Sequence, residues 1–344
     1  MMYDFISVYW GSNLDNLENL EAKSNLIIAT DTSIKILRKL LPSNVYNKSE
    51  ILLRTSGYPH VEEIKLVNLD SNLPRHFDNL ICIGGGATLD FGKLLLSEIP
   101  NIGTVFNIPK LVLIPTNIGS GAEVTRFSTL WDYQLKSKKS ILLPENIERQ
   151  IFYLEVPLKS LRDDQLEIGS LDALAHSFDS LFSKASDPLT RLIAKQNIHA
   201  ICQILNSYYQ CGSPLTEKLI ELQVLSSLGG MCINQTKSSI SHAFSYGLTL
   251  EFGIVHGYSV AIMMSLAIRK FRRDLISINP ETLETIEIIE ETLNGAKLEA
   301  KIPGFNLLIS QNIDKLVAQV DTYRLSNFIF PIDSKEYRDF FLNS

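Results

Sequence analysis

Short apolar runs alternate with helix-like segments through the first half of the chain. Three such runs occupy residues 26–30, 80–83 and 111–115, and each of the first two is followed by a segment with the apolar spacing of a helix. Continuous apolar strands separated by helices are typical of a parallel sheet that is covered on both faces. The pattern therefore predicts an open parallel α/β sheet in this half.

From about residue 158 the pattern changes, and apolar residues recur at the spacing of helices. Few later segments have the composition of a strand. The longest helical segments are residues 171–182, 188–209 and 216–233. We therefore expect an α/β domain over residues 1–157, followed by an all-helical domain over residues 158–344.

Composition and charge exclude several classes of protein. The 344 residues are 45% hydrophobic and 20% charged, as in soluble globular proteins. A net charge of -6 argues against a general nucleic-acid-binding protein. The apolar runs are too short to span a bilayer, and the four cysteines lack the spacing of a disulfide framework. A cytoplasmic protein with reduced thiols is expected.

Glycine-rich loops follow the second and third predicted strands. Gly84, Gly85 and Gly86 stand where a strand gives way to a helix, and residues 116–121 form a loop rich in glycine and hydroxyl groups. Backbone without Cβ atoms, next to a helix N-terminus, suits a pyrophosphate. Glycine at such turns also has purely structural uses. Two such loops on neighbouring strands nevertheless favour a nucleotide site at the carboxyl edge of the sheet.

Asp31 follows the first predicted strand and belongs to the same edge. A carboxylate there can accept hydrogen bonds from an adenosine ribose, and it would favour NAD over NADP. An equally good interpretation is that Asp31 caps the helix that follows. The sequence leaves both interpretations open.

Asp172 and His176 have the spacing of two ligands to one metal ion. They are four residues apart, so they lie on one face of a predicted helix. An ordinary helix-stabilising pair has the same spacing. The neighbouring residues are largely apolar, however, and a buried aspartate–histidine pair requires polar or ionic partners.

His242 and His256 are fourteen residues apart, which would separate them by about 21 Å on one straight helix. Gly253 and Gly257 bracket His256 and predict a reversal of the chain between the two histidines. Such a reversal would bring both imidazoles to the aspartate–histidine pair. Three imidazoles and one carboxylate suit a divalent transition metal such as Fe²⁺ or Zn²⁺ and leave room for a substrate oxygen.

Taken together, these motifs resemble those of the iron-containing (group III) alcohol dehydrogenase family. GGGATLDFGK is similar to the family's GGG-S-x-x-D-x-x-K segment, and IPTNIGSGAEVT is similar to its P-T-T-x-G-T-G-S-E-V-T loop. DALAH and the H-x13-H-G segment are similar to its metal motifs. The resemblance runs from residue 80 to residue 260 and implies the fold shared with dehydroquinate synthase. It assigns NAD(P) to residues 1–157, and metal and substrate to residues 158–344.

The resemblance also implies roles for individual residues. The positions that match its cofactor-binding residues are Gly84, Gly85, Gly86, Asp90, Thr116, Ser120 and either Lys138 or Lys139. The positions that match its metal ligands are Asp172, His176, His242 and His256. Asn117 and Ala122 depart mildly from the second loop's pattern. Tyr246 stands where many relatives have a second histidine near the substrate, which makes it a candidate proton donor.

The segments TKSSISHAFSYGLT and FSTLWD are most similar to the phosphonoacetaldehyde reductase branch of that family. The substrate implied by this branch is a small aldehyde that carries a phosphonate group. Lys237 and Arg126 are then candidates for holding the anion. The alternative is that both are ordinary surface charges.

The function expected from these features is a metal-dependent, NAD(P)-linked alcohol dehydrogenase or aldehyde reductase, assembled as a homodimer. One alternative is a cyclase or lyase of the dehydroquinate synthase kind, which uses NAD transiently. Another is a non-catalytic homologue with the same fold. The complete set of aspartate and three histidines argues against the last of these.

Overall fold

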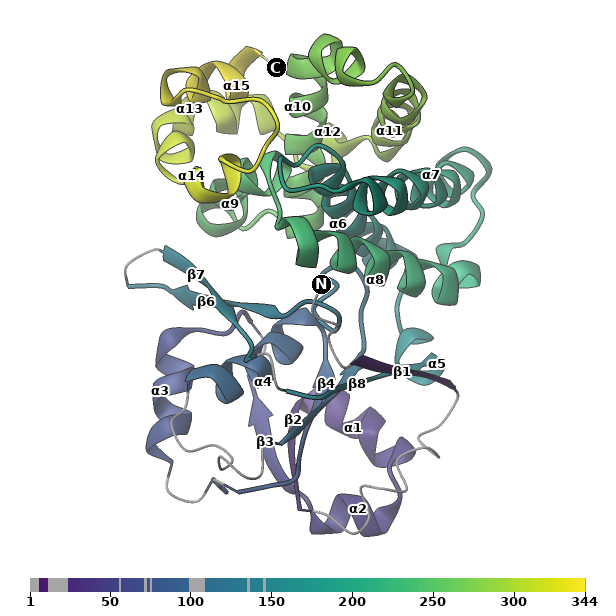
Figure 1. The fold of residues 1–344 in the computed structure, drawn as a ribbon, viewed down its shortest axis with the longest axis vertical. Coiled ribbons are helices and arrows are strands. Elements are labelled where there is room, and N and C mark those ends of the chain that lie inside the picture. Colours follow the sequence, from purple (N-terminus) through teal and green to yellow (C-terminus); the bar gives the residue numbers. More distant parts are fainter. Residues whose placement is uncertain are drawn as a thin grey trace. The chain divides into compact units, whose positions relative to one another are not determined.

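A computed structural model of the protein describes residues 6–11, 24–55, 57–70, 73–74, 76–98, 109–134, 137–144 and 147–343. The chain forms two compact units (Figure 1). The first unit consists of Met1–Asn117 with Ala122–Leu161, and the second consists of Ile118–Gly121 with Arg162–Ser344. The assignment of cofactor to residues 1–157 and of metal to residues 158–344 stays a prediction.

The first unit is built on a parallel sheet of six strands in the order β1-β8-β5-β4-β2-β3. The strands are β1 (Ile6–Gly11), β2 (Asn25–Thr30), β3 (Glu50–Arg54), β4 (Asn79–Gly84), β5 (Lys110–Pro115) and β8 (Arg149–Leu154). An antiparallel hairpin is formed by β6 (Phe127–Asp132) and β7 (Ser137–Leu142). The helices of this unit are α1 (Asp31–Leu40), α2 (Ser43–Lys48), α3 (Val61–Leu69), α4 (Gly86–Glu98) and α5 (Glu155–Leu158).

The central strands are apolar over most of their length because both of their faces are covered. In β2, Leu26 and Ile28 pack into a core with Phe91 of α4, whereas Ile27 packs into a second core with Leu37 of α1. Neighbouring residues of a strand point to opposite faces, so a strand that is buried on both sides needs an apolar residue at nearly every position. The predicted α/β sheet is therefore confirmed.

The second unit is helical, as predicted. Its α-helices are α6 (Asp163–Leu181), α7 (Pro188–Cys211), α8 (Leu219–Thr236), α9 (Ile240–Phe252), α10 (His256–Ile278), α11 (Thr282–Ala296), α12 (Leu298–Lys301), α13 (Phe305–Ala318), α14 (Thr322–Leu325) and α15 (Tyr337–Asn343). Two short 3₁₀ turns are η2 (Leu215–Lys218) and η3 (Ser334–Glu336). Within the described part of the chain, no helix combines the length and apolar character needed to cross a membrane.

The predicted reversal between His242 and His256 is present. Helix α9 ends at Phe252, and Gly253 closes it in the left-handed conformation with φ 66° and ψ 17°. Helix α10 then begins at His256 itself. The part predicted for Gly257 is wrong, because this residue lies inside α10. A Cβ atom there would come within 2.2 Å of the Ile168 carbonyl oxygen, so Gly257 permits the close approach of α10 to α6.

The segment Ile118–Gly121 packs against helices α6 and α8 through glycine-to-glycine contacts. Gly121 has φ 57°, and a Cβ atom on it would lie 2.4 Å from the Cα atom of Gly230 in α8. The Gly119 amide donates a 2.6 Å hydrogen bond to the Ser226 hydroxyl of the same helix. Backbone approaches backbone here, so the glycine is needed for both its conformation and its size.

The Gly121→Ala variant is expected to lose about 2–4 kcal/mol of unfolding free energy, because it combines left-handed strain with overpacking against backbone. Gly212→Ala is the matched control, since Gly212 has φ 70° but a Cβ atom there would meet nothing within 4 Å. That variant should lose only about 1–2 kcal/mol. Urea unfolding measures both values. Equal losses in the two variants would contradict a steric role for the contact with Gly230.

Candidate metal centre and cofactor loops

The two predicted glycine loops follow neighbouring strands of the sheet. Strands β4 and β5 are paired, with Gly84 opposite Pro115, and the Thr116 amide donates a 3.0 Å hydrogen bond to the Gly84 carbonyl. Helix α4 begins at Gly86, so its first amides come directly after β4. The loops therefore start together at the carboxyl edge of the sheet, where α/β proteins bind nucleotides.

Asp31 lies at the same edge, because β2 pairs with β4. The capping interpretation of Asp31 is wrong. Thr30 caps helix α1 by a reciprocal capping box with Ser33, and Asp31 is the first residue within the helix. Its side chain is exposed. Its role toward a ribose stays a prediction.

Asp90 has structural partners inside the first unit. One of its oxygens lies 2.9 Å from the Lys93 ammonium, and the other accepts a 3.1 Å hydrogen bond from the Thr129 amide in β6. Lys93 is fully buried and also donates to the carbonyls of Thr125 and Phe127. Burial lowers the pKa of this lysine, although Asp90 opposes that shift. The pair joins α4 to β6, and a role of Asp90 toward a cofactor stays a prediction.

The two candidate lysines occupy opposite faces of strand β7. The Lys138 ammonium lies 5.0 Å from the centroid of the Trp131 ring, whereas Lys139 is exposed. Arg126 donates a 3.2 Å hydrogen bond to the Leu143 carbonyl at the base of the hairpin. Cation placement over an aromatic ring distinguishes Lys138 from its neighbour. The choice between the lysines as cofactor contacts stays a prediction.

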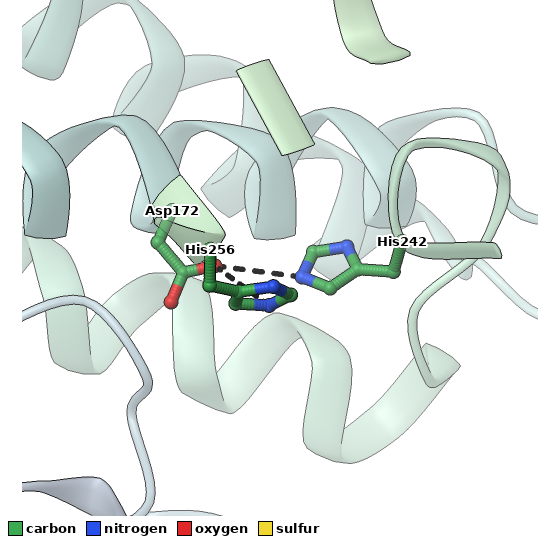
Figure 2. Close-up of side chains that lie close together, drawn as sticks. All are labelled: Asp172, His242 and His256. Carbon is green, nitrogen blue, oxygen red and sulfur yellow. Dashed lines mark ion pairs between the residues drawn. The ribbon is translucent and has the colours of Figure 1, made fainter. Parts of the chain in front are cut away.

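The second unit brings together an aspartate and three histidines from three helices. Asp172 of α6, His242 of α9 and His256 of α10 point toward one another, and their ligating atoms all lie within 4.8 Å (Figure 2). The Asp172 Oδ1 atom is 3.5 Å from His242 Nε2 and 3.8 Å from His256 Nε2. His176, one turn along α6, also places its Nε2 atom 3.7 Å from that oxygen.

These separations fit a shared cation better than hydrogen bonds. They exceed hydrogen-bonding distance, yet two ligands of a tetrahedral ion bound at about 2.1 Å would be about 3.4 Å apart. Asp172 Oδ1 and His242 Nε2 are buried and have no hydrogen-bond partner. A buried polar atom without a partner is costly, and a divalent cation would satisfy both atoms at once. The donor set of one carboxylate and three imidazoles suits such an ion.

The electrostatic surroundings act differently on the individual donors. Burial alone would lower the pKa of His242, but the carboxylates of Asp172 and Asp179 raise it, so a cation bound there would have to displace a proton from this ring. Burial lowers the pKa of His176 to about 4, so its imidazole is neutral at neutral pH. The rings of His176 and His242 are stacked, with centroids 4.7 Å apart. Burial alone would raise the pKa of Asp172, but the adjacent histidines lower it well below its usual range. A carboxylate and neutral imidazoles are the species required for coordination.

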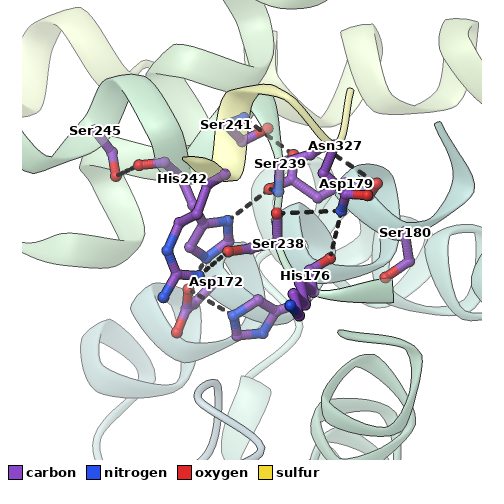
Figure 3. A network of polar contacts seen from close by, with 12 residues as sticks. Asp172, His176, Asp179, Ser180, Ser238, Ser239, Ser241, His242, Ser245 and Asn327 are labelled. Atoms are coloured by element: carbon purple, nitrogen blue, oxygen red, sulfur yellow. Dashed lines mark hydrogen bonds and ion pairs between the residues drawn. The ribbon is translucent and has the colours of Figure 1, made fainter. Parts of the chain in front are cut away.

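Asp179 orients His242 and was missed by the sequence analysis. It is fully buried, and its Oδ2 atom lies 2.8 Å from His242 Nδ1 (Figure 3). The amides of Ser239 and Ser241 donate to the same carboxylate at 2.6 and 3.0 Å. Burial alone would raise the pKa of Asp179, but these hydrogen bonds outweigh it and lower the pKa. An ionised Asp179 accepts from Nδ1–H, which leaves the Nε2 lone pair directed at Asp172.

Two sequence models of one family match the chain. The model described as "Iron-containing alcohol dehydrogenase" matches residues 10–149, and the model described as "Fe-containing alcohol dehydrogenase family, C-terminal" matches residues 168–303. The chain belongs to the iron-containing alcohol dehydrogenase family. The resemblance predicted from the four motifs is thereby confirmed.

Curated relatives in the iron-containing alcohol dehydrogenase family match this chain over part of their length. The 1,3-propanediol dehydrogenase of Klebsiella pneumoniae is 28% identical over 238 residues, which are 63% of this chain and 58% of that protein. The phosphonoacetaldehyde reductase of Streptomyces viridochromogenes is 26% identical over 209 residues, which are 56% of this chain and 53% of that protein. The matched regions thus span little more than half the length of these relatives.

Solved structures agree with the fold over almost the whole chain. An iron-containing alcohol dehydrogenase from Thermotoga maritima has a TM-score of 0.78 at 22% identity and covers 99% of this chain and 98% of its own. The sulfoacetaldehyde reductase of Bifidobacterium kashiwanohense, solved in complex with NAD⁺, has a TM-score of 0.79 at 17% identity and covers 99% and 97%. The predicted fold class is therefore confirmed.

Tyr246, the candidate proton donor, lies close in the chain to the candidate metal ligand His242. It lies one turn beyond His242 on α9 and is 4% exposed. Burial raises the pKa of its phenol well above the ordinary value of 10, although the charge of Arg324 opposes this shift. The phenol is therefore neutral at physiological pH and keeps its proton.

Lys237 lies in the link between two helices. Helix α8 ends at Thr236, and Lys237 has φ 63° and ψ 168° in the link to α9. Its ammonium contacts the Tyr323 hydroxyl and lies 4.9 Å from the centroid of that ring. At the end of α8, the Thr236 hydroxyl lies within hydrogen-bonding distance of the Ser180 hydroxyl and of the Cys232 and Lys237 carbonyls.

Proposed function

We propose that this member of the iron-containing alcohol dehydrogenase family is a metal-dependent, NAD(P)-linked alcohol dehydrogenase or aldehyde reductase. The observation that carries the proposal is the single Asp172 oxygen with three histidine Nε2 atoms 3.5–3.8 Å away. The reaction is hydride transfer between the nicotinamide and a small aldehyde. Its relatives include proteins named as 1,3-propanediol dehydrogenase and phosphonoacetaldehyde reductase.

The metal centre is assigned to Asp172, His176, His242 and His256, with Fe²⁺ and Zn²⁺ as the candidate ions. When bound, such an ion supplies Lewis-acid polarisation of the substrate oxygen. Asp179 holds the His242 ring so that its Nε2 atom stays available, because the buried carboxylate fixes the proton on Nδ1. The ligands come from α6, α9 and α10, and rigid helices hold such a site within narrow geometric limits.

The cofactor is assigned to the loops that follow β4 and β5. Gly84, Gly85 and Gly86 would admit a pyrophosphate to the start of α4, because the backbone there carries no side chains. Thr116 and Ser120 would contact it from the second loop. Exposed Asp31 would receive the adenosine ribose and favour NAD over NADP.

Proton delivery to the reduced substrate is assigned to Tyr246. Its neutral phenol is buried one turn from His242 and retains its proton at neutral pH. A group with a strongly raised pKa is a weak acid, so it is effective only toward a strongly basic oxygen such as a developing alkoxide.

The substrate proposed at the finest level is phosphonoacetaldehyde, with 2-hydroxyethylphosphonate as the alcohol. Support comes from the segment around His242 and from the 26% identical relative of that name. We also propose a cytoplasmic homodimer. Lys237 and Arg126 remain candidate anion contacts, although Arg126 already donates to Leu143.

The deciding experiment is a screen of NADH and NADPH consumption across small aldehydes, with Fe²⁺ or Zn²⁺ supplied. Turnover of phosphonoacetaldehyde ahead of neutral aldehydes is expected. Turnover of neutral aldehydes alone would contradict the phosphonate substrate and leave the reaction class standing. A cyclase that uses NAD transiently would give no net consumption with any aldehyde. A non-catalytic homologue would in addition fail to take up metal.

A further inference from the structure

Arg324 places a nearly buried positive charge beside the helix that carries His242. Its side chain is 12% exposed and projects from α14. The guanidinium contacts the Ser238 hydroxyl and lies 5.6 Å from the centroid of the Tyr246 ring. Its Nε atom is 3.3 Å from an Asp321 oxygen.

These contacts locate the guanidinium relative to the metal ligands. Tyr246 follows His242 by four residues on α9, so the two side chains lie on the same helix face. Helix α14 is held against α9, because the Asp321 amide donates a 3.0 Å hydrogen bond to the Ala243 carbonyl. Ser238 belongs to the same polar network as Asp172, His176 and His242 (Figure 3). The guanidinium therefore lies against the helix face that presents His242.

The local chemistry favours an anion at this point. A guanidinium has five donors in a planar fork and binds oxyanions in preference to neutral acceptors. Its partners here include the Asp321 carboxylate and the neutral hydroxyl of Ser238. A substrate oxyanion is a stronger acceptor than a hydroxyl and would form charge-assisted hydrogen bonds in a largely desolvated setting.

A second cation lies on the adjacent residues. Lys237 precedes Ser238 in the chain, and its ammonium contacts Tyr323, which precedes Arg324. Asn327 donates to the Thr236 carbonyl and holds this link against the segment that contains α14. The link between α8 and α9, which carries Lys237, therefore packs against α14, which carries Arg324.

We propose that Arg324, assisted by Lys237, determines substrate specificity by binding a terminal oxyanion of the aldehyde. The substrate class is a short aldehyde that bears a carboxylate, sulfonate or phosphonate group at its far end. The inference rests on the proposed reductase function. It assigns the role predicted for Arg126 to a residue of the metal-bearing unit.

The alternative is that Arg324 only fastens α14 to α9, and two substitutions separate these roles. Arg324→Gln removes the charge, whereas Asp321→Asn removes the competing carboxylate and leaves an amide that can still cap α14. Arg338→Gln is the matched control, because Arg338 is an exposed arginine of α15 that is paired with Asp314. Each variant is assayed with phosphonoacetaldehyde, sulfoacetaldehyde, succinic semialdehyde and neutral butyraldehyde.

Oxyanion binding by Arg324 predicts opposite changes in the two variants. In Arg324→Gln, kcat/KM for the anionic aldehydes should fall roughly 10- to 100-fold relative to butyraldehyde, mainly through KM. In Asp321→Asn the same ratio should rise severalfold, and Arg338→Gln should match the wild type. The three anionic aldehydes together show which oxyanion is preferred. Equal losses of kcat/KM for charged and neutral aldehydes in both variants would show that Arg324 only holds α14 against α9.

A binding measurement separates this inference from the proposed reaction. Titration calorimetry with ethylphosphonate and ethanesulfonate, using propanol as the neutral reference, reports anion binding without turnover. Weaker anion binding by Arg324→Gln than by the wild type supports the inference, even if no aldehyde is reduced. A failure to reduce any aldehyde would contradict only the proposed reductase function. Unchanged anion binding in Arg324→Gln, or no anion binding by the wild type, overturns the inference.

Discussion

The His256→Ala variant is expected to lose about a thousandfold or more in turnover while it still binds NADH. His256 is the first residue of α10, and its side chain is 27% exposed, so its removal disturbs the core little. It also supplies one of the three Nε2 atoms around Asp172. Loss of a metal that contributes several kcal/mol to the transition state corresponds to about three powers of ten in rate.

Three measurements on His256→Ala test this expectation together. Metal content by mass spectrometry should fall, aldehyde-dependent NADH consumption should disappear, and NADH fluorescence titration should be unchanged. His199→Ala is the matched control, because His199 is a partly buried histidine of α7 whose ring contacts Thr285. Turnover that survives in His256→Ala would exclude this histidine as a ligand. Loss of NADH binding together with turnover would contradict the division between cofactor loops and metal centre.

The sheet could be predicted because the nearly continuous apolar residues of its strands indicate burial on both faces. Residues 26–30 are apolar at every position except the last, as expected for a strand packed on both faces. The neighbouring placement of the two glycine loops followed from the same argument. The caps could not be assigned as reliably, because Thr30 and Asp31 are both good capping residues and only the backbone geometry selects Thr30.

Two glycines show which structural roles local sequence can predict and which it cannot. Gly253 was predicted as a turn and adopts a left-handed conformation, since nothing else in the segment could end α9 there so easily. Gly257 was predicted for the same reason and serves a different purpose. Glycine is required at position 257 because the backbone of Ile168, on another helix and distant in sequence, leaves no space for a Cβ atom. Composition alone does not distinguish a turn glycine from one that admits a neighbouring backbone.

Asp179 and Arg324 were not found because their partners are remote in the chain. Asp179 lies 63 residues from His242, and Arg324 lies 86 residues from Ser238. A signal for Asp179 did exist, since it follows His176 by three residues and so shares a face of an otherwise apolar helix. Arg324 had no such signal, because its helix is short and its importance depends on packing against α9.

The Asp179→Ala variant is expected to bind metal about 10–100 times more weakly than the wild type, although Asp179 is not a ligand. Without this carboxylate, His242 Nδ1 loses its partner, and the ring loses both its orientation and its preferred tautomer. The amides of Ser239 and Ser241 also lose their acceptor, at a cost of about 1–3 kcal/mol each. Asp179→Asn keeps one acceptor oxygen and should recover part of both losses.

Metal affinity must be separated from stability to test the role of Asp179. Asp187→Ala provides the control, because Asp187 caps α7 through the Thr190 amide and its loss should lower stability by about 0.5–2 kcal/mol. Metal titration of the folded protein should give wild-type affinity for that variant and weakened affinity for Asp179→Ala. Urea unfolding without metal measures the stability of each. If Asp179→Ala bound metal as tightly as Asp187→Ala did, the Asp179 carboxylate would stabilise only the fold. The hydrogen bond between Asp179 and His242 would then not be needed to orient the His242 ring toward the metal ion.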